Sequence, residues 1–548
     1  MNREIGRGKL IGQQGPGSIY VDTDGSSYLI SSADKWYDRE IKNSYIDKRD
    51  FELRDSRLEK ILMVDKFLEV PDYRTTFDKS NAKNTKLSIP IARFPLLEYC
   101  SKCGTFRKAK PTYSNRKRRC FHCEEKQNFI QFPIVVMCKE GHISDFPHFR
   151  YIHVKKENMD SCSRQWIDRT GPSLLNWTLR CNCGANHSLT GVTGKSSNDK
   201  GTPFMNEMHG AKCYGEMPWT GSDIKADCEN FPMAVLKNSL NVYRPDVVEA
   251  LSFSDSEDRN NYNITFEELL HEEFTMLKGK ADTEKLKVEL SFDSYSKDKV
   301  IRSVNYVRRL EQLVVQTNFH REEHIEEVES FERSQEGTQV SNLFSPEYTD
   351  RRWYPAKRVY GEGIFIEINS KLTADWEKKE ELTSHYSKLE ARVGEFYLRE
   401  KFDSPSAILM HTLSHALIKE LSKQSGYPIT SIRERLYLSD NEKGILLYVT
   451  DSDKAGTYGG LVRLAKKEKF EEIMSTALNN MEWCSSDPVC FELGDSFGQG
   501  VQNSNGAACH NCSFVPSTSC SYRNCFLDRD YLSRIDSDVK ITNWYDMM

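Results

Sequence analysis

The chain has 548 residues, a formal net charge of −5, and 38% apolar and 29% charged residues. This length suffices for several domains with hydrophobic cores. The negative net charge excludes a positive electrostatic field over the whole chain. Binding to nucleic acid would therefore require a local basic patch or a partner protein. The first residues lack the apolar segment of a signal peptide, and the longest apolar run, FPIVVMC, is too short to cross a membrane. We therefore expect a cytoplasmic protein in which the thiols of its sixteen cysteines stay reduced and are available to metal, with disulfides as the alternative.

The sequence predicts an α+β multidomain protein. Zinc-ribbon-like modules are expected to be inserted among mixed α/β domains, with a zinc-binding domain in the C-terminal part. The expected parts are an N-terminal α/β segment, a zinc-ribbon-rich region with two cysteine clusters, an acidic helical region, a strand with a charged helix, and the C-terminal domain. Their expected boundaries are, in that order, 1–98, 99–235, 236–345, 346–403 and 404–535.

Local patterns predict several elements in chain order. Near the N-terminus, GQQGPGSIYVDTDGSSYLI predicts two short strands around the turn Asp24-Gly25. In the acidic region, helical spacing of apolar residues predicts a helix that includes Val304, Val307, Leu310 and Val314.

The C-terminal domain is expected to open with a long helix. Ser404 precedes Pro405 in the manner of an N-cap followed by the first helical residue, and Gly426 marks the end. The run GILLYVT then predicts a strand, and a further helix is expected before the last cysteine group.

The first cysteine group has the spacing of a zinc ribbon, CxxC-x16-CxxC, with the expected ligands Cys100, Cys103, Cys120 and Cys123. The loop between the two pairs contains no acidic residue. Seven cations in it predict phosphate contacts, with a merely solvated loop as the alternative: Arg107, Lys108, Lys110, Arg116, Lys117, Arg118 and Arg119.

The middle cysteine group is less regular and offers more donors than one four-ligand site can use. The expected ligands are Cys162, Cys181, Cys183 and Cys213. Cys138 and His142 are alternates that could replace one or two of these, and Cys228 is expected to be a spare thiol.

The third group is expected to bind zinc through Cys490, Cys509, Cys512 and Cys520, with Cys484 and Cys525 as extra thiols. The three groups together predict about three zinc ions. Each site would be closed by four protein ligands, which is typical of structural rather than catalytic zinc.

Enzyme-like motifs are present but incomplete. His411 and His415 lie one helical turn apart, without the adjacent glutamate of a zinc protease, and are expected to be packed histidines. His153 and Lys155 fit one copy of a phospholipase D motif that needs two copies. We therefore expect no catalytic and no other cofactor-binding residues. A nuclease using His153 and Lys155, or a stand-alone nucleic-acid-binding regulator, remains the alternative.

Specific motifs resemble the DrmB family, the zinc-containing subunits of DISARM anti-phage defence systems. They include Arg93-Phe94-Pro95, Cys138-Lys-Glu-Gly-His142, Asp145-Phe146-Pro147, Pro218-Trp219 and Gly361-Glu362-Gly363-Ile364-Phe365. The C-terminal part is similar to the zinc-binding domain of MrfA-type repair helicases through Asp487-Pro488-x-Cys490, Ala508-Cys509-His510-x-Cys512, Ser519-Cys520 and Leu527-Asp528-Arg529. Cys181-Asn-Cys183 departs from a normal CxxC pair.

The resemblance implies a role that the composition does not. Members of this family pair with DrmA, a helicase subunit with its own ATP site, and engage DNA mainly through that complex. The same systems include a phospholipase D-like protein and a methyltransferase. The chain is thus expected to be a non-catalytic, helicase-associated zinc scaffold with no membrane contact.

Overall fold

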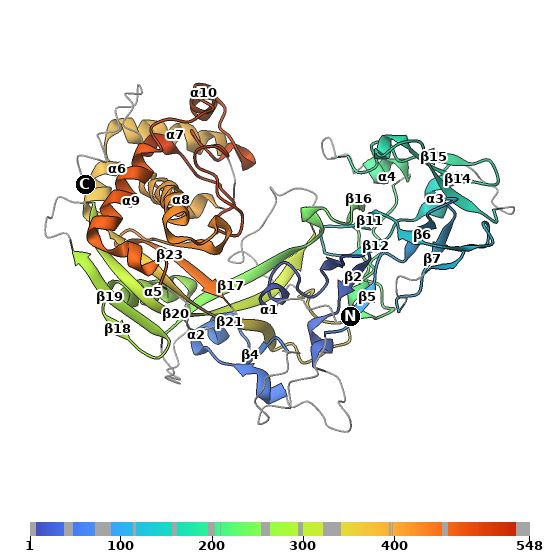
Figure 1. The fold of residues 1–548 in the computed structure, drawn as a ribbon, viewed down its shortest axis with the longest axis horizontal. Coiled ribbons are helices and arrows are strands. Elements are labelled where there is room, and N and C mark those ends of the chain that lie inside the picture. Colours follow the sequence, from blue (N-terminus) through green and yellow to red (C-terminus); the bar gives the residue numbers. More distant parts are fainter. Residues whose placement is uncertain are drawn as a thin grey trace.

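The computed structural model describes residues 7–37, 48–71, 89–112, 117–155, 162–194, 203–208, 210–253, 264–293, 300–321, 341–393, 396, 398–451 and 459–532. A long hairpin of two strands, β20 (Ile301–His320) and β21 (Trp353–Ile368), runs through the middle of the molecule. In Figure 1 it connects the cysteine-rich N-terminal half with the helices of the C-terminal half.

The hairpin is the centre of a nine-stranded sheet. Along its main path the order is β18-β19-β20-β21-β23-β22, while β17 pairs with the second half of β20, and β4 joins β21 in parallel and pairs with β3. Besides the hairpin, the strands are β3 (Glu52–Leu53), β4 (Lys66–Glu69), β17 (Arg244–Ser252), β18 (Ala281–Asp282), β19 (Leu286–Asp293), β22 (Ile432–Leu438) and β23 (Lys443–Asp451).

The expected helix over residues 304–314 was wrong, because this segment is part of β20. A β-bulge between Val307 and Leu310 shifts the register against β21, and these two side chains join a different buried cluster from Val304. Apolar residues that recur at helical spacing in the sequence thus belong to buried clusters on different faces of the sheet. The β-branched side chains fit a strand buried on both faces.

Helices cover both faces of the sheet. On one face α5 (Phe266–Lys278) packs Phe274 and Leu277 against β19, β20 and β22. On the other lies α8 (Pro405–Ser425), which is buried along most of its length. Its expected ends are confirmed, with Gly426 at φ 84° as the left-handed C-cap. The neighbouring helices are α6 (Ser370–Glu377), α7 (Glu380–Val393), α9 (Lys467–Asn479) and α10 (Val489–Ser496).

Small sheets build the cysteine-rich half, shown in teal and blue in Figure 1. The predicted N-terminal hairpin is confirmed as β1 and β2, around the turn at Asp24-Gly25. The strands are β1 (Ile19–Val21), β2 (Ser27–Ile30), β5 (Ile91–Arg93), β6 (Leu97–Cys100), β7 (Phe106–Lys108), β8 (Arg118–Arg119), β9 (Lys126–Gln127), β10 (Phe129–Gln131), β11 (Ile134–Met137), β12 (Ile143–Asp145), β13 (Gln165–Arg169), β14 (Trp177–Cys181), β15 (Asn186–Ser188) and β16 (Met233–Leu236).

The remaining short helices are α1 (Arg7–Leu10), α3 (His148–Ile152), α4 (Pro203–Glu207) and α2 (Ser56–Ile61), of which α2 packs against the nine-stranded sheet. The mixture of small sheets, a large sheet and covering helices confirms the α+β class expected from the sequence. Among the described helices, none is long and apolar enough to cross a membrane.

A buried ion pair fastens α5 to β22. Arg435 donates to both carboxylate oxygens of Glu273, at 2.7 and 2.9 Å, and the Tyr437 hydroxyl lies 3.0 Å from the same carboxylate. Glu273 also accepts the backbone N–H of Leu251. All polar atoms of this fully buried carboxylate are therefore engaged.

We expect Arg435→Ala to lower the thermal unfolding temperature of the full chain by several degrees. It leaves a buried carboxylate without its cation, which costs roughly 3–5 kcal/mol. Differential scanning fluorimetry measures the change. The matched control Lys469→Ala removes one partner of an exposed pair with Glu472 and should shift the temperature little. Equal shifts for both variants would contradict the importance of the buried pair.

Candidate metal centres

Four groups of cysteine-rich side chains place their sulfur and nitrogen atoms within 4.8 Å of one another. Measured Sγ–Sγ distances within them are 3.6–3.9 Å. Four thiolates around a tetrahedral Zn²⁺ with bonds of about 2.3 Å have sulfur–sulfur edges of about 3.8 Å. A disulfide would require about 2.05 Å. The spacing thus fits zinc, and all sixteen cysteines are free of disulfides.

The first centre contains the four residues that the sequence grouped together: Cys100, Cys103, Cys120 and Cys123. Each CxxC pair forms a tight turn that closes with a backbone hydrogen bond, from Gly104 N to Cys100 O and from Glu124 N to Cys120 O. Gly104 adopts φ +70°, and a Cβ there would meet the carbonyl oxygen of Ile167 at 2.2 Å. The local turns therefore aim two pairs of sulfur atoms at one point.

The middle cysteines form two centres rather than the single site expected. The second centre joins Cys138, His142, Cys213 and Cys228. His142 Nδ1 lies 3.4 Å from Cys138 Sγ and 3.8 Å from Cys213 Sγ, while Cys228 Sγ is 3.8 Å from Cys138 Sγ. Cys228, expected to be a spare thiol, is thus a candidate ligand. Cys213 lies here rather than with Cys162, Cys181 and Cys183.

A buried cation compensates the charge of this second centre. Arg321 follows β20, is fully buried, and donates to the carbonyl oxygens of Gly141 and Gly17 at 2.8 and 2.7 Å and to that of Val242. Burial lowers the pKa of Arg321 to about 9, and the nearby Cys138 thiol opposes this shift. A zinc ion with three thiolates and one neutral imidazole is net negative, so the guanidinium balances it.

The third centre joins His153, Cys162, Cys181 and Cys183. His153 follows helix α3, and its Nε2 lies 3.3 Å from Cys162 Sγ and 3.4 Å from Cys183 Sγ. Its Nδ1 lies 2.6 Å from the carbonyl oxygen of Phe149, a contact that fixes ring orientation in metal-binding histidines. The shortened Cys181-Asn-Cys183 pair is completed by this imidazole, which the sequence had linked to a nuclease motif.

The fourth centre joins Cys484, Cys490, Cys509 and Cys512. The closest sulfur pairs are Cys484 with Cys509 at 3.6 Å and Cys490 with Cys512 at 3.9 Å. Cys520, expected in this set, instead places its Sγ 3.3 Å from Nε2 of His411.

Two cations lie beside the fourth centre, and Cys525 is buried in a different cluster of the C-terminal core. Lys419 of α8 donates to the carbonyl oxygen of Cys512, and Arg529 pairs with Asp487, whose other carboxylate oxygen accepts the Cys484 N–H. Cys525 joins none of the metal-binding groups found among the described residues. Burial raises the pKa of its thiol to about 11, so it remains protonated.

The cations of the first centre's loop divide into two sets. Arg107 and Arg118 contact the buried carboxylate of Glu98, which also pairs with Arg93. Their charge is therefore used inside the fold. Exposed cations of the same loop are Lys108, Lys110, Lys117 and Arg119, and Arg116 lies outside the described residues.

We expect Cys228→Ala to reduce the zinc content of the purified chain by about one ion per molecule, because a tetrahedral centre with three ligands binds far more weakly. Inductively coupled plasma mass spectrometry measures the ratio. Cys525→Ala is the matched control, a buried cysteine outside the four centres, and should keep the wild-type ratio. An unchanged zinc content in Cys228→Ala would mean that Cys228 is a spare thiol and not a zinc ligand.

Comparisons with known proteins agree with this arrangement. A family model described as a domain of unknown function (DUF8724) matches residues 6–244, which contain the first three centres. The MrfA Zn-binding domain matches residues 413–513, which contain the fourth. Zinc is therefore the metal of this chain, and its clusters exceed the three groups expected from spacing.

A curated relative covers nearly the whole chain. It is the DISARM protein DrmB of Bacillus paralicheniformis (strain ATCC 9945a / NCIMB 11709 / CD-2), 27% identical over 563 aligned residues, which comprise 88% of this chain and 94% of that protein. The resemblance inferred from the motifs is thus confirmed: the chain is similar to DrmB of DISARM over 88% of its length and carries an MrfA-type zinc-binding domain in its C-terminal part.

Proposed function

We propose that the chain is a non-catalytic, zinc-binding scaffold subunit that associates with the DISARM helicase subunit DrmA and helps that complex to load on DNA in anti-phage defence. The observation that carries the proposal is the similarity to DrmB over 88% of the chain. A cytoplasmic location and contacts with the phospholipase D-like protein and the methyltransferase of such systems belong to the same proposal.

The surroundings of the nucleophile candidates support a non-catalytic role. His153 points its Nε2 at two thiols, so the imidazole is engaged as a candidate ligand and is not presented to a phosphodiester. The four cysteine-rich centres each offer four protein donors, which leaves no open coordination position for a reacting water. This arrangement disfavours the alternative of a nuclease that uses His153 and Lys155.

Exposed cations on the first centre support contact with DNA. Lys108 and Lys110 follow the first CxxC pair, and Lys117 and Arg119 precede the second. All four side chains are exposed. Because Arg107 and Arg118 already contact Glu98, phosphate contacts would be made by this smaller set. Since the whole chain carries a net charge of −5, we propose that its binding to DNA is weak without the helicase.

An apolar ridge beside the fourth centre supports contact with another protein. The ridge consists of Trp483, Val489, Leu493 and Phe497, with 69, 57, 40 and 73% of their surface exposed. Val489 and Leu493 lie four residues apart on one face of α10, and Phe497, four residues further on, is the C-cap residue of that helix. Cys484 and Cys490 hold this segment to the metal centre, so the ridge is presented rigidly. Clustered exposed apolar and aromatic side chains are typical of protein interfaces.

We expect the quadruple change of Lys108, Lys110, Lys117 and Arg119 to Ser to weaken DNA binding by the helicase complex for all sequences and to flatten its salt dependence. Each lost phosphate contact removes one counterion-release contribution. Fluorescence anisotropy at several salt concentrations measures both effects.

The matched control for this variant changes Lys378, Lys466, Lys467 and Lys469 to Ser, which removes the same charge from exposed positions elsewhere. If the loop variant binds with unchanged affinity and salt slope, DNA is bound by the partner alone. If the isolated wild-type chain binds DNA as tightly as the complex does, the stand-alone regulator is the better description.

We expect the double variant Leu493→Ser and Phe497→Ser to lose most of its co-purification with the neighbouring helicase, because the change removes apolar area from the centre of the ridge. Pull-down of the tagged chain after co-expression measures the loss. The control changes Leu175 and Leu240 to Ser, two residues that are 65 and 89% exposed away from the ridge. Full co-purification of the ridge variant would place the helicase contact elsewhere.

A further inference from the structure

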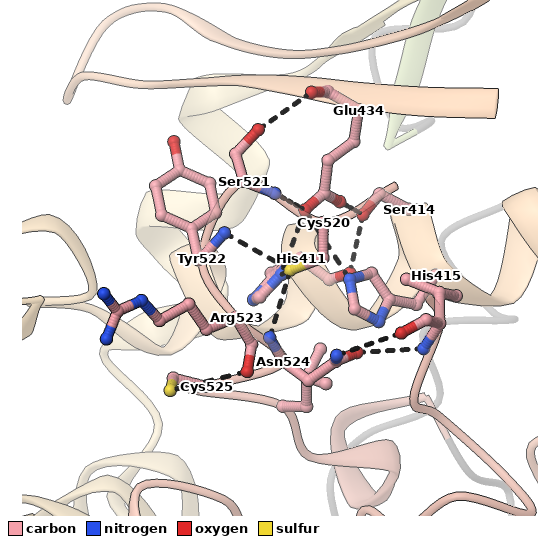
Figure 2. A network of polar contacts seen from close by, with 12 residues as sticks. His411, Ser414, His415, Glu434, Cys520, Ser521, Tyr522, Arg523, Asn524 and Cys525 are labelled. Atoms are coloured by element: carbon pink, nitrogen blue, oxygen red, sulfur yellow. Dashed lines mark hydrogen bonds and ion pairs between the residues drawn. The ribbon is translucent and has the colours of Figure 1, made fainter. Parts of the chain in front are cut away.

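A fifth group of potential ligands lies in the core beneath the fourth centre. It consists of His411 and His415 of α8, Glu434 of β22, and Cys520 from the loop after the last CxxC pair. Figure 2 shows these side chains converging from three separate segments. The sequence interpretation treated the two histidines as packing residues and assigned Cys520 to another site, because residues 411, 434 and 520 are far apart along the chain.

The distances in this group fit a tetrahedral metal ion. His411 Nε2 lies 3.3 Å from Cys520 Sγ and 3.2 Å from Glu434 Oε1, and His415 Nε2 lies 3.5 Å from the same oxygen. Bond lengths of about 2.0–2.3 Å from Zn²⁺ to nitrogen, oxygen and sulfur give ligand–ligand edges of about 3.4–3.6 Å. The three measured separations are thus close to those that an ion would require, and all four donor atoms lie within 4.8 Å of one another.

The contacts of His415 leave its Nε2 facing the other members of the group. His415 Nδ1 lies 2.9 Å from the carbonyl oxygen of Ser513, to which it donates, and its buried Nε2 has no hydrogen-bond partner among the described residues. In the neutral ring Nε2 is then the nitrogen without a hydrogen, and it lies 3.5 Å from Glu434 Oε1, where two acceptors repel each other unless a cation lies between them. Metal-bound histidines commonly have a carbonyl or carboxylate partner on the other ring nitrogen.

Cys520 shows the same surroundings as the cysteines of the other centres. Its Sγ accepts the backbone N–H of Tyr522 at 3.3 Å and that of Asn524 at 3.2 Å. The N–H two residues after the cysteine makes the same contact at Cys213 and Cys484. Backbone donors stabilise a thiolate rather than a thiol. Cys520 thus has the surroundings of a ligand.

Charge and burial point to the same conclusion. The cysteine-rich centres are net negative when a divalent ion binds, and each has at least one partly exposed member. Two neutral imidazoles, one carboxylate and one thiolate neutralise a divalent ion completely. Such a centre can be buried at the lowest cost, and all four members of the fifth group are buried, both histidines completely.

We propose that His411, His415, Glu434 and Cys520 bind a further zinc ion, in a closed structural site distinct from the cysteine-rich centres. Two nitrogens, one oxygen and one sulfur in a tetrahedral arrangement suit Zn²⁺. The family match at residues 413–513 leaves out both His411 and Cys520, so the zinc-binding domain alone does not account for this site.

The ion would fasten the C-terminal segment to the core. Glu434 accepts the N–H of Ser521 through its carboxylate, and its backbone N–H donates to Ser519 O at 3.2 Å. The same segment continues to Asp528, which contacts His385, and to Arg529, which contacts Asp487 of the fourth centre. Loss of the fifth ion should therefore loosen the peptide that supports the fourth centre.

Native mass spectrometry of the full-length chain tests the proposal. We expect five zinc ions per wild-type molecule and a loss of about one in Cys520→Ala, together with faster backbone hydrogen exchange around residues 516–532. Cys525→Ala is the matched control and should retain the wild-type count, because this neighbouring buried cysteine belongs to none of the ligand groups found among the described residues. A Cys520→Ala chain that keeps every ion would overturn the site.

A second measurement needs no variant and so is independent of misfolding. In the cadmium-113 NMR spectrum of the metal-exchanged wild-type chain, a site with one thiolate should resonate well upfield of sites with three or four. We expect one such upfield signal in addition to those of the cysteine-rich centres. A spectrum that contains only signals of thiolate-rich sites would refute the fifth centre, whatever the chain does with DNA or a helicase.

Discussion

Tetrahedral coordination of cysteine sulfur takes the place of a hydrophobic core at the first and fourth centres. The buried cluster at the first centre consists of Cys100, Cys120 and Phe129, with Cys103 and Cys123 packed against it. The cluster at the fourth centre contains cysteines alone. Loops of this size cannot bury enough apolar surface to offset their lost conformational freedom. The positions of the basic loop and of the apolar ridge therefore both depend on bound metal.

The charges of the metal centres shape their surroundings. Thiolate-rich centres attract cations from distant parts of the chain: Arg321 at the end of β20 lies beside the second, and Lys419 of α8 contacts the fourth. These contacts attach the centres to the large sheet and to its covering helix. In the fifth group the donors themselves balance a divalent ion, which is why it can lie at the centre of the C-terminal core.

The nine-stranded sheet gives the molecule its continuity. Its β20–β21 hairpin reaches from the second centre, through Arg321, to the sheet face that α8 covers (Figure 1). The basic loop of the first centre and the apolar ridge beside the fourth lie in different halves of the molecule. This suits the proposed scaffold, which would contact DNA and a motor protein at separate places. Four histidines, His142, His153, His411 and His415, each lie in a group of candidate metal ligands.

The sequence alone determined what depends on neighbouring residues. CxxC pairs place two sulfurs on one turn, an Asp-Gly step closes a hairpin, and Pro405 and Gly426 bound a helix by their fixed or left-handed backbone. The resemblance to DrmB also followed from short motifs. These features require only local geometry, and the structure has them where the sequence placed them.

The tertiary structure alone decided which distant donors meet. Spacing placed Cys213 with Cys162 and Cys520 with Cys490, yet in the folded chain each lies at a different centre, and Cys228, His153 and Glu434 arrive from other segments. The valine-rich stretch at residues 304–314 likewise became a strand, since its neighbours on both sides come from elsewhere in the chain. A metal centre needs four donors at one point in space, and only the folded sheet and helices bring the last one or two donors to that point.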